Sequence, residues 1–206
     1  MRSTSITLLA GALALALAAC GDRSAIDDAA TPPATPAADA GVDQAPPASD
    51  MTTASTADAI AILSATEGNS VTGELSFTVI EGGVAIQGQV NGLPPNSEHG
   101  FHVHENGDCS APDGSSAGGH FNPLAVAHGR IGEGDHHVGD TDNIVADDTG
   151  VARVDTRLEG ATLADGAPTD ILGKGVIVHA DADDYTTQPT GNAGARLACG
   201  VISQPM

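Results

Sequence analysis

Short segments with alternating hydrophobic residues occupy much of the chain after residue 58. Leu75, Phe77 and Val79 alternate with other residues along one segment, and Val84 and Ile86 do so along the next. An alternation with a period of two is typical of β-strands that bury one face. Glycine-containing turns separate the segments. Further strands are predicted in the apolar segments at residues 59–65, 101–104, 143–146, 151–158, 173–179 and 197–202.

The whole pattern favours an all-β fold. No segment shows a convincing hydrophobic repeat of 3.6 residues, so long helices are not expected. About eight short antiparallel strands are typical of a sandwich or barrel. Two long segments, residues 105–142 and 180–195, do not fit the strand pattern. Loops of this length in a compact domain are usually functional.

The first 58 residues differ in composition from the rest of the chain. Residues 1–19 combine a short positive start with an apolar stretch, and Leu17-Ala18-Ala19-Cys20 resembles the bacterial lipoprotein signal. That signal implies an acylated Cys20 that anchors the protein to a membrane. An ordinary secretory signal with an incidental cysteine is the alternative. Residues 20–58, rich in Ala, Pro, Thr and Asp, predict a disordered tether, which leaves residues 59–206 as the folded domain.

The cysteine count fits export and lipidation. The chain has three cysteines, an odd number that needs an explanation in an exported protein. Lipidation of Cys20 would account for one and leave Cys109 and Cys199 as a pair. Export places this pair in an oxidising compartment, where a disulfide persists. Two free buried thiols are the alternative. Lipidation and export together predict a periplasmic protein held at the membrane of a bacterial cell envelope.

The chain is strongly acidic. It contains 27 Asp and Glu residues against seven Lys and Arg residues, and its formal net charge is −20. Nucleic acid is therefore not an expected partner, because phosphate backbones attract basic surfaces. For most of these carboxylates the charge indicates solubility alone.

Histidines gather in one part of the chain in a pattern that predicts metal binding. Six of the eight lie between residues 100 and 140, and histidine is the commonest ligand for zinc and copper. His102 and His104, two positions apart on a predicted strand, point to the same face. His179 ends another predicted strand and is either a ligand or a structural residue. Three imidazoles with a carboxylate suit zinc, and three or four imidazoles suit copper. The loop between the strands supplies further candidates, His120, His128, His137 and Asp140.

Four segments resemble motifs of the copper/zinc superoxide dismutases. They are residues 100–105, 119–123, 137–140 and 191–200, and they follow one another in the family order. The resemblance covers the chain from about Ala59 to its end. It implies a flattened eight-stranded antiparallel Greek-key barrel with two long functional loops. It also implies copper and zinc as cofactors, and the dismutation of the superoxide anion to oxygen and hydrogen peroxide.

The same resemblance implies a role for each matching residue. His120 would bridge the two metals as an imidazolate, Asp183 would tie a copper ligand to a zinc ligand, and Arg196 would receive the anion beside the copper. It also implies the disulfide between Cys109 and Cys199. His99 and His136 match no ligand and are expected to be structural or surface groups. The implied copper ligands are His102, His104, His120 and His179, and the implied zinc ligands are His120, His128, His137 and Asp140.

Some properties stay open at the level of sequence. A non-catalytic metal-binding envelope lipoprotein on the same barrel is the alternative function, and the protein is expected to be a monomer or a homodimer. One departure from the family is electrostatic. Bacterial relatives place lysines near the mouth of the active site, whereas residues 106–119 and 180–195 contain no Lys or Arg. We therefore expect weak electrostatic steering of superoxide.

Overall fold

The computed structural model describes residues 58–205. The predicted signal segment, Cys20 and the tether before Asp58 lie outside the described residues. No helix within residues 58–205 is long and apolar enough to cross a membrane. The elements are β1 (Ala59–Ala65), β2 (Thr72–Ile80), β3 (Gly83–Asn91), β4 (Glu98–His99), β5 (Phe101–His104), the 3-10 helix η1 (Ser115–Ala117), β6 (Ile144–Val145), β7 (Val151–Glu159), β8 (Gly175–His179) and β9 (Arg196–Val201).

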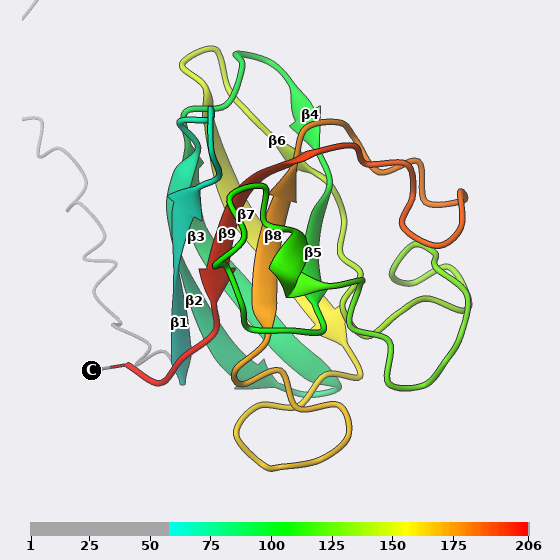
Figure 1. Cartoon of the computed structure of the whole chain (residues 1–206). Helices are drawn as coiled ribbons and strands as arrows, with labels where there is room; N and C mark the ends of the chain where they lie inside the picture. Colours follow the sequence, from blue (N-terminus) through cyan, green and yellow to red (C-terminus); the bar gives the residue numbers. More distant parts are fainter. Residues whose placement is uncertain (1–57, 206) are drawn as a thin grey trace, which may run out of the picture. The chain divides into compact units, whose positions relative to one another are not determined.

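Seven of the strands form one curled antiparallel sheet. Its order is β5-β8-β9-β1-β2-β3-β7, and β4 pairs with β6 in a small separate sheet (Figure 1). The predicted all-β antiparallel fold is confirmed. Within residues 58–205 there are nine strands rather than the eight or so predicted, because the two-residue strand β4, which pairs with β6, was not expected.

The hairpin of β2 and β3 shows how the alternating pattern builds the core. Leu75, Phe77, Val84 and Ile86 are at most 1% exposed, and Phe77 lies opposite Ile86. Val79 was predicted on the same buried face but is 54% exposed. That part of the prediction is wrong. Val79 lies at the end of the hairpin, and three of the residues around it are glycines, Gly82, Gly83 and Gly160, which have no side chains to cover it.

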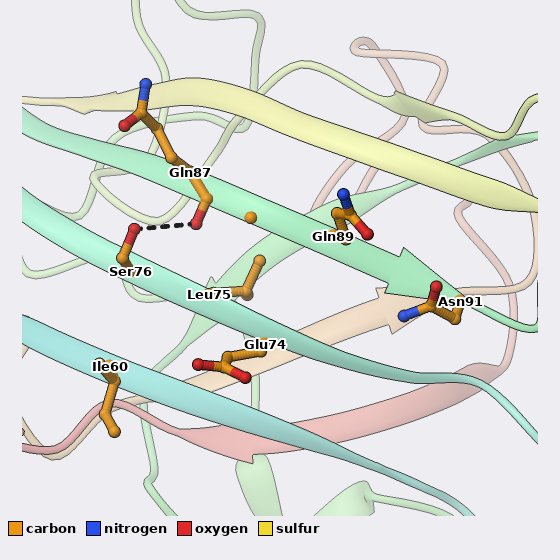
Figure 2. A pocket seen from close by; sticks show the side chains of 8 residues that line it. Ile60, Glu74, Leu75, Ser76, Gln87, Gln89 and Asn91 are labelled. Carbon is orange, nitrogen blue, oxygen red and sulfur yellow. Dashed lines mark hydrogen bonds between the residues drawn. The ribbon is translucent and has the colours of Figure 1, made fainter. Parts of the chain in front are cut away.

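The outer face of the same hairpin is polar. Figure 2 shows Glu74 and Ser76 of β2 beside Gln87 and Gln89 of β3, around a shallow hollow at Gly88. The Ser76 hydroxyl donates a hydrogen bond to the Gln87 carbonyl at 3.1 Å. Polar residues outside and apolar residues inside are what a sheet with one solvated face requires. This face contains none of the candidate metal ligands.

Strand β5 presents its two faces to different environments. Phe101 and Val103 belong to the hydrophobic core and are fully buried. The alternation of a strand therefore places His102 and His104 on the opposite face. Strand β8 pairs with β5, with Val178 opposite Phe101. The core on one side thus fixes the position of the two histidines on the other.

The two long loops predicted from the sequence are present, one between β5 and β6 and the other between β8 and β9. The loop between β5 and β6 contains only η1, and the loop between β8 and β9 contains no regular element; both lie on the same side of the sheet in Figure 1. The predicted disulfide is confirmed: Cys109 of the first loop is bonded to Cys199 of β9. It closes a loop with a sequence separation of 90, which in the chain-entropy model stabilises the fold by roughly 4–5 kcal/mol.

A third long connection, residues 160–174, was not set apart in the sequence pattern. Its backbone is organised by one carboxylate, because Asp170 accepts hydrogen bonds from the N–H groups of Ala164, Gly166 and Leu172. The strand predicted from residue 173 therefore begins two residues later, at Gly175.

Replacing Phe101 by Ala tests whether the core side of β5 supports the histidine side. Removal of this fully buried ring should lower the free energy of unfolding by about 3–5 kcal/mol, because a large cavity remains. Urea unfolding of the metal-free, disulfide-bonded protein measures the loss. Ile62→Ala on β1, where Ile62 is 55% exposed, is the control and should change stability by less than about 0.5 kcal/mol. Equal losses in both variants would contradict the burial argument.

Candidate metal centre

Two clusters of buried potential ligands lie side by side and share one residue. Within each cluster the ligand atoms lie within 4.8 Å of one another. His120 belongs to both clusters. The histidine cluster consists of His102, His104, His120 and His179, and the mixed cluster consists of His120, His128, His137 and Asp140.

Strands and loop backbone bring these residues together from distant parts of the sequence. His102 and His104 come from β5, and His179 is the last residue of β8. The loop returns to β5 through a bridge between His104 and His120. Gly139 then hydrogen-bonds Val103 and Phe121 through its backbone. A Cβ at Gly139 would lie 2.2 Å from the Val103 carbonyl oxygen, so this close approach requires glycine.

The histidine cluster directs one nitrogen of each ring inward. The Nδ1 of His104 donates to the Gly118 carbonyl at 3.0 Å, and the Nδ1 of His179 lies 3.4 Å from the Gly194 carbonyl oxygen. The opposite nitrogens of these two rings, both Nε2, lie 3.3 Å apart. Hydrogen bonds to the outer nitrogens fix the ring orientation and leave the inner nitrogens available to a metal.

The mixed cluster is arranged around the carboxylate of Asp140. Its Oδ1 lies 2.8 Å from Nδ1 of His120 and 3.3 Å from Nδ1 of His137, and its Oδ2 lies 3.0 Å from Nδ1 of His128. The backbone N–H of His137 also donates to Oδ2 at 2.8 Å. Three imidazole nitrogens and one carboxylate oxygen thus converge, as in a closed tetrahedral site.

Unpaired buried nitrogens show that these residues fit metal ions. In residues 58–205, a few buried side-chain atoms have no hydrogen-bond partner, and all belong to the two clusters. A buried polar atom without a partner costs about 1–3 kcal/mol, and metal coordination removes that cost. The atoms are His102 Nδ1, His120 Nε2, His128 Nδ1 and His137 Nδ1.

Three rings of the histidine cluster, those of His104, His120 and His179, have lowered pKa values, which favours their neutral form. Burial holds the pKa of His104 and of His179 well below the ordinary value, and neighbouring histidines and Arg196 lower each pKa further. Burial also lowers the pKa of His120 to about 4, although Asp140 opposes that shift. A neutral imidazole has a free lone pair, which is the form that binds a metal.

The mixed cluster behaves differently. Burial lowers the pKa of His128, but the nearby carboxylates of Asp140 and Asp183 outweigh burial and raise it to about 9. Burial raises the pKa of Asp140, but its contacts with three histidines hold that pKa far below the usual range. Because the pKa of His128 is raised, a metal ion at the mixed cluster competes with a proton for this ring.

Asp183 connects the two clusters. Its Oδ2 accepts from Nε2 of His102 at 2.7 Å, and its Oδ1 accepts from Nε2 of His128 at 3.0 Å. These contacts lower the pKa of Asp183 against the effect of burial. Gly191 passes so close that a Cβ there would lie 1.6 Å from Asp183 Oδ1. The glycine at position 191 is thus required by the packing of the bridging carboxylate.

Arg196 lies beside the histidine cluster, at the start of β9. Its guanidinium donates to the carbonyls of Gly114 and Gly118, each at 2.6 Å. Gly118 is also the acceptor for His104. The side chain is half-buried, and burial lowers its pKa while Asp113 acts in the opposite direction. A fixed cation next to the histidine cluster can bind an anion there.

The sequence pattern did not assign a role to several residues that support the clusters. His99 is buried, and its ring contacts the His179 carbonyl through Nδ1 at 2.8 Å. His136 contacts the His137 carbonyl and belongs to neither cluster. Gln188 and Asn143 form side-chain hydrogen bonds with the backbones of His128 and Asp183. Isolated amides in loops follow no periodicity, so no sequence signal could have found them.

Comparisons with known proteins agree with this geometry. A family model described as copper/zinc superoxide dismutase (SODC) matches residues 71–202. Superoxide dismutase (Cu-Zn) 2 of Aquifex aeolicus is 42% identical over 140 residues, which cover 66% of this chain and 81% of that protein. The superoxide dismutase-like protein YojM of Bacillus subtilis is 41% identical over 123 residues, covering 58% of this chain and 63% of that protein.

The likeness extends to a solved structure. A crystal structure of a SOD-like protein from Bacillus subtilis matches with a TM-score of 0.63 and 38% sequence identity, covering 69% of this chain and 96% of that chain. The matched region contains β2 through β9 and both ligand clusters. Sequence, fold and ligand geometry lead to the same conclusion: the chain belongs to the copper/zinc superoxide dismutase family.

Proposed function

We propose that this protein converts two superoxide ions and two protons into oxygen and hydrogen peroxide at the paired clusters. The observation that carries the proposal is His120, which belongs to both complete ligand sets. The histidine cluster is assigned to copper, because several neutral imidazoles suit this metal. The mixed cluster is assigned to zinc, because three imidazoles and a carboxylate suit a closed tetrahedral site.

Each side chain of the site would have a separate role in the reaction. The histidine cluster would hold copper, which would supply the one-electron redox chemistry that links the two superoxide ions. Arg196 binds the anion by charge-assisted hydrogen bonds. Nε2 of His120 has no hydrogen-bond partner within residues 58–205, so it would take up one proton from solvent and pass it to the reduced oxygen species, while solvent supplies the second proton. Asp183 keeps His102 and His128 in their orientations, so that both clusters hold their geometry.

We also propose that the protein acts in the periplasm, bound to the envelope membrane through Cys20. The basis is the sequence Leu17-Ala18-Ala19-Cys20 and the confirmed pairing of the other two cysteines. At this place the enzyme would protect the cell envelope from superoxide. Residues 20–58 would act as the tether between the lipid and the domain of residues 59–206.

His120→Ala tests the proposed function. Wild-type protein that is stripped and reloaded should contain one copper and one zinc per chain and should remove superoxide rapidly. His120→Ala should lose most activity, because the imidazole shared by the two clusters is gone. With cobalt(II) in place of the diamagnetic zinc, the variant should also lose the magnetic coupling between copper(II) and cobalt(II). His136→Ala is the matched control and should retain both. Full metal content in the wild type without superoxide removal would favour the alternative, a non-catalytic metal-binding envelope lipoprotein.

Intact-mass analysis of the mature protein tests the anchor. The protein isolated from bacterial membranes should begin at Cys20 with an acyl modification and should contain no free thiol, since Cys109 and Cys199 are bonded. Cys20→Ala should move the protein into the soluble periplasmic fraction. An unmodified mature N-terminus at another residue would show an ordinary secretory signal.

The salt dependence of the rate of superoxide removal tests the expectation that electrostatic steering of superoxide is weak. Arg130 is bound to Asp142 at 2.8 Å, and Lys174 donates to the Glu105 carbonyl at 3.0 Å. Because both cations are held by local contacts and the two loops contain no other, long-range attraction of superoxide should be weak. From about 10 to 200 mM salt the wild-type rate should fall by less than roughly twofold, because there is little attraction to screen.

Arg196→Ala should reverse the sign of this dependence. Without the guanidinium, repulsion by the acidic domain dominates, so salt should raise the residual rate. Asp113→Asn provides the opposite control, because Asp113 and Arg196 affect each other's pKa through their charges; its rate at low salt should exceed that of the wild type. Stopped-flow measurements of superoxide removal by the wild type and the two variants, made at increasing salt, test these expectations. A steep fall of the wild-type rate with salt would refute weak steering.

A further inference from the structure

Two side-chain amides join the metal-binding loops by paired hydrogen bonds. The Oε1 of Gln188 accepts from the His128 N–H at 2.9 Å, and its Nε2 donates to the His128 carbonyl at 2.9 Å. In the reverse direction, Oδ1 of Asn143 accepts from the Asp183 N–H at 2.9 Å, and its Nδ2 donates to the Asp183 carbonyl at 3.0 Å. Each loop thus holds the backbone of a residue in the other.

His128 depends on its amide partner more than the other ligands do. A buried N–H and C=O must both find partners, and within residues 58–205 the two groups of His128 bond to the Gln188 side chain and to no backbone group. In contrast, His102, His104 and His179 are fixed by strand pairing. The backbone of His137 and Asp140 forms its own hydrogen-bonded turn.

The position of the His128 ring follows from the position of its backbone. Its Nε2 donates to Asp183, and its Nδ1 points at the mixed cluster, 3.0 Å from Asp140 Oδ2. Both ring contacts require the Cα of His128 to stay where Gln188 holds it.

We propose that Gln188 is a positioning residue for the mixed cluster, and that it sets the zinc affinity of this cluster with little influence on the histidine cluster. The inference rests on the metal assignment of the proposed function. Its test measures metal binding at each cluster and needs no superoxide assay, so a failure of dismutase activity would be seen separately.

The test uses two replacements and a matched control in the full chain. Gln188→Met keeps the length of the side chain and removes both hydrogen bonds. Gln188→Glu keeps an acceptor for the His128 N–H and removes the donor to the carbonyl. Thr187→Val, at the neighbouring position, removes a hydrogen bond of 2.6 Å to Asp184 that stays within the same loop. Cobalt(II) replaces zinc as a spectroscopic probe of the mixed cluster, and copper(II) resonance spectra report on the histidine cluster.

Gln188→Met should weaken cobalt and zinc binding roughly tenfold or more, because two hydrogen bonds that orient a ligand are lost. The visible bands of cobalt should shift as the tetrahedral geometry loosens. Gln188→Glu should lose less affinity, while Thr187→Val and copper binding in all variants should stay within about twofold of the wild type.

Two outcomes would overturn the proposal. One is a Gln188→Met protein with wild-type cobalt affinity and an unchanged spectrum. The other is an equal loss at both clusters accompanied by a lower melting temperature of the metal-free protein, which would indicate a general role in stability. If Gln188→Met does not fold, Gln188→Glu alone decides, since its selective loss at the mixed cluster is required and its wild-type affinity would refute the proposal.

Discussion

Burial of seven candidate metal ligands beside one another is the constraint on which the rest of this fold depends. Six imidazoles and one carboxylate lie against the sheet, each at most 5% exposed. Buried polar groups are costly unless each finds a partner. The outer nitrogens and oxygens find theirs in carbonyls, N–H groups and Asp183, and the inner atoms converge on the two positions where metals bind. The loops are as long as they are because they must supply these partners.

The two clusters meet this constraint by different electrostatic means. In the histidine cluster, burial lowers the pKa of His104 and of His179 and so favours their neutral form. Where Asp140 enters, the charge of the carboxylate is balanced by a proton on His128 until a metal replaces it. His120 belongs to both clusters, and two opposing effects act on its pKa: burial lowers it and Asp140 raises it.

Much of the fold and of the candidate site could be predicted from the sequence, for identifiable reasons. Alternation predicts a strand wherever one face is buried along its whole length, as it is for Leu75 and Phe77. It fails for Val79, because this residue lies at the end of the hairpin, where the glycines around it have no side chains to cover it. That His102 and His104 lie on the same face of β5 follows from strand geometry alone. The hydrogen bonds of Gln188 depend on how two loops meet in space, which neither composition nor spacing records.

The anchoring of Arg196 has a consequence for the entropy of anion binding. A free arginine side chain loses up to about 2 kcal/mol of rotamer entropy when it is fixed. Here that loss is incurred during folding, because Gly114 and Gly118 already hold the guanidinium and the disulfide at Cys109 ties the same loop to β9. A guanidinium has five N–H groups, so donors remain for a ligand. An anion that reaches this arginine therefore meets a receptor that needs no further ordering.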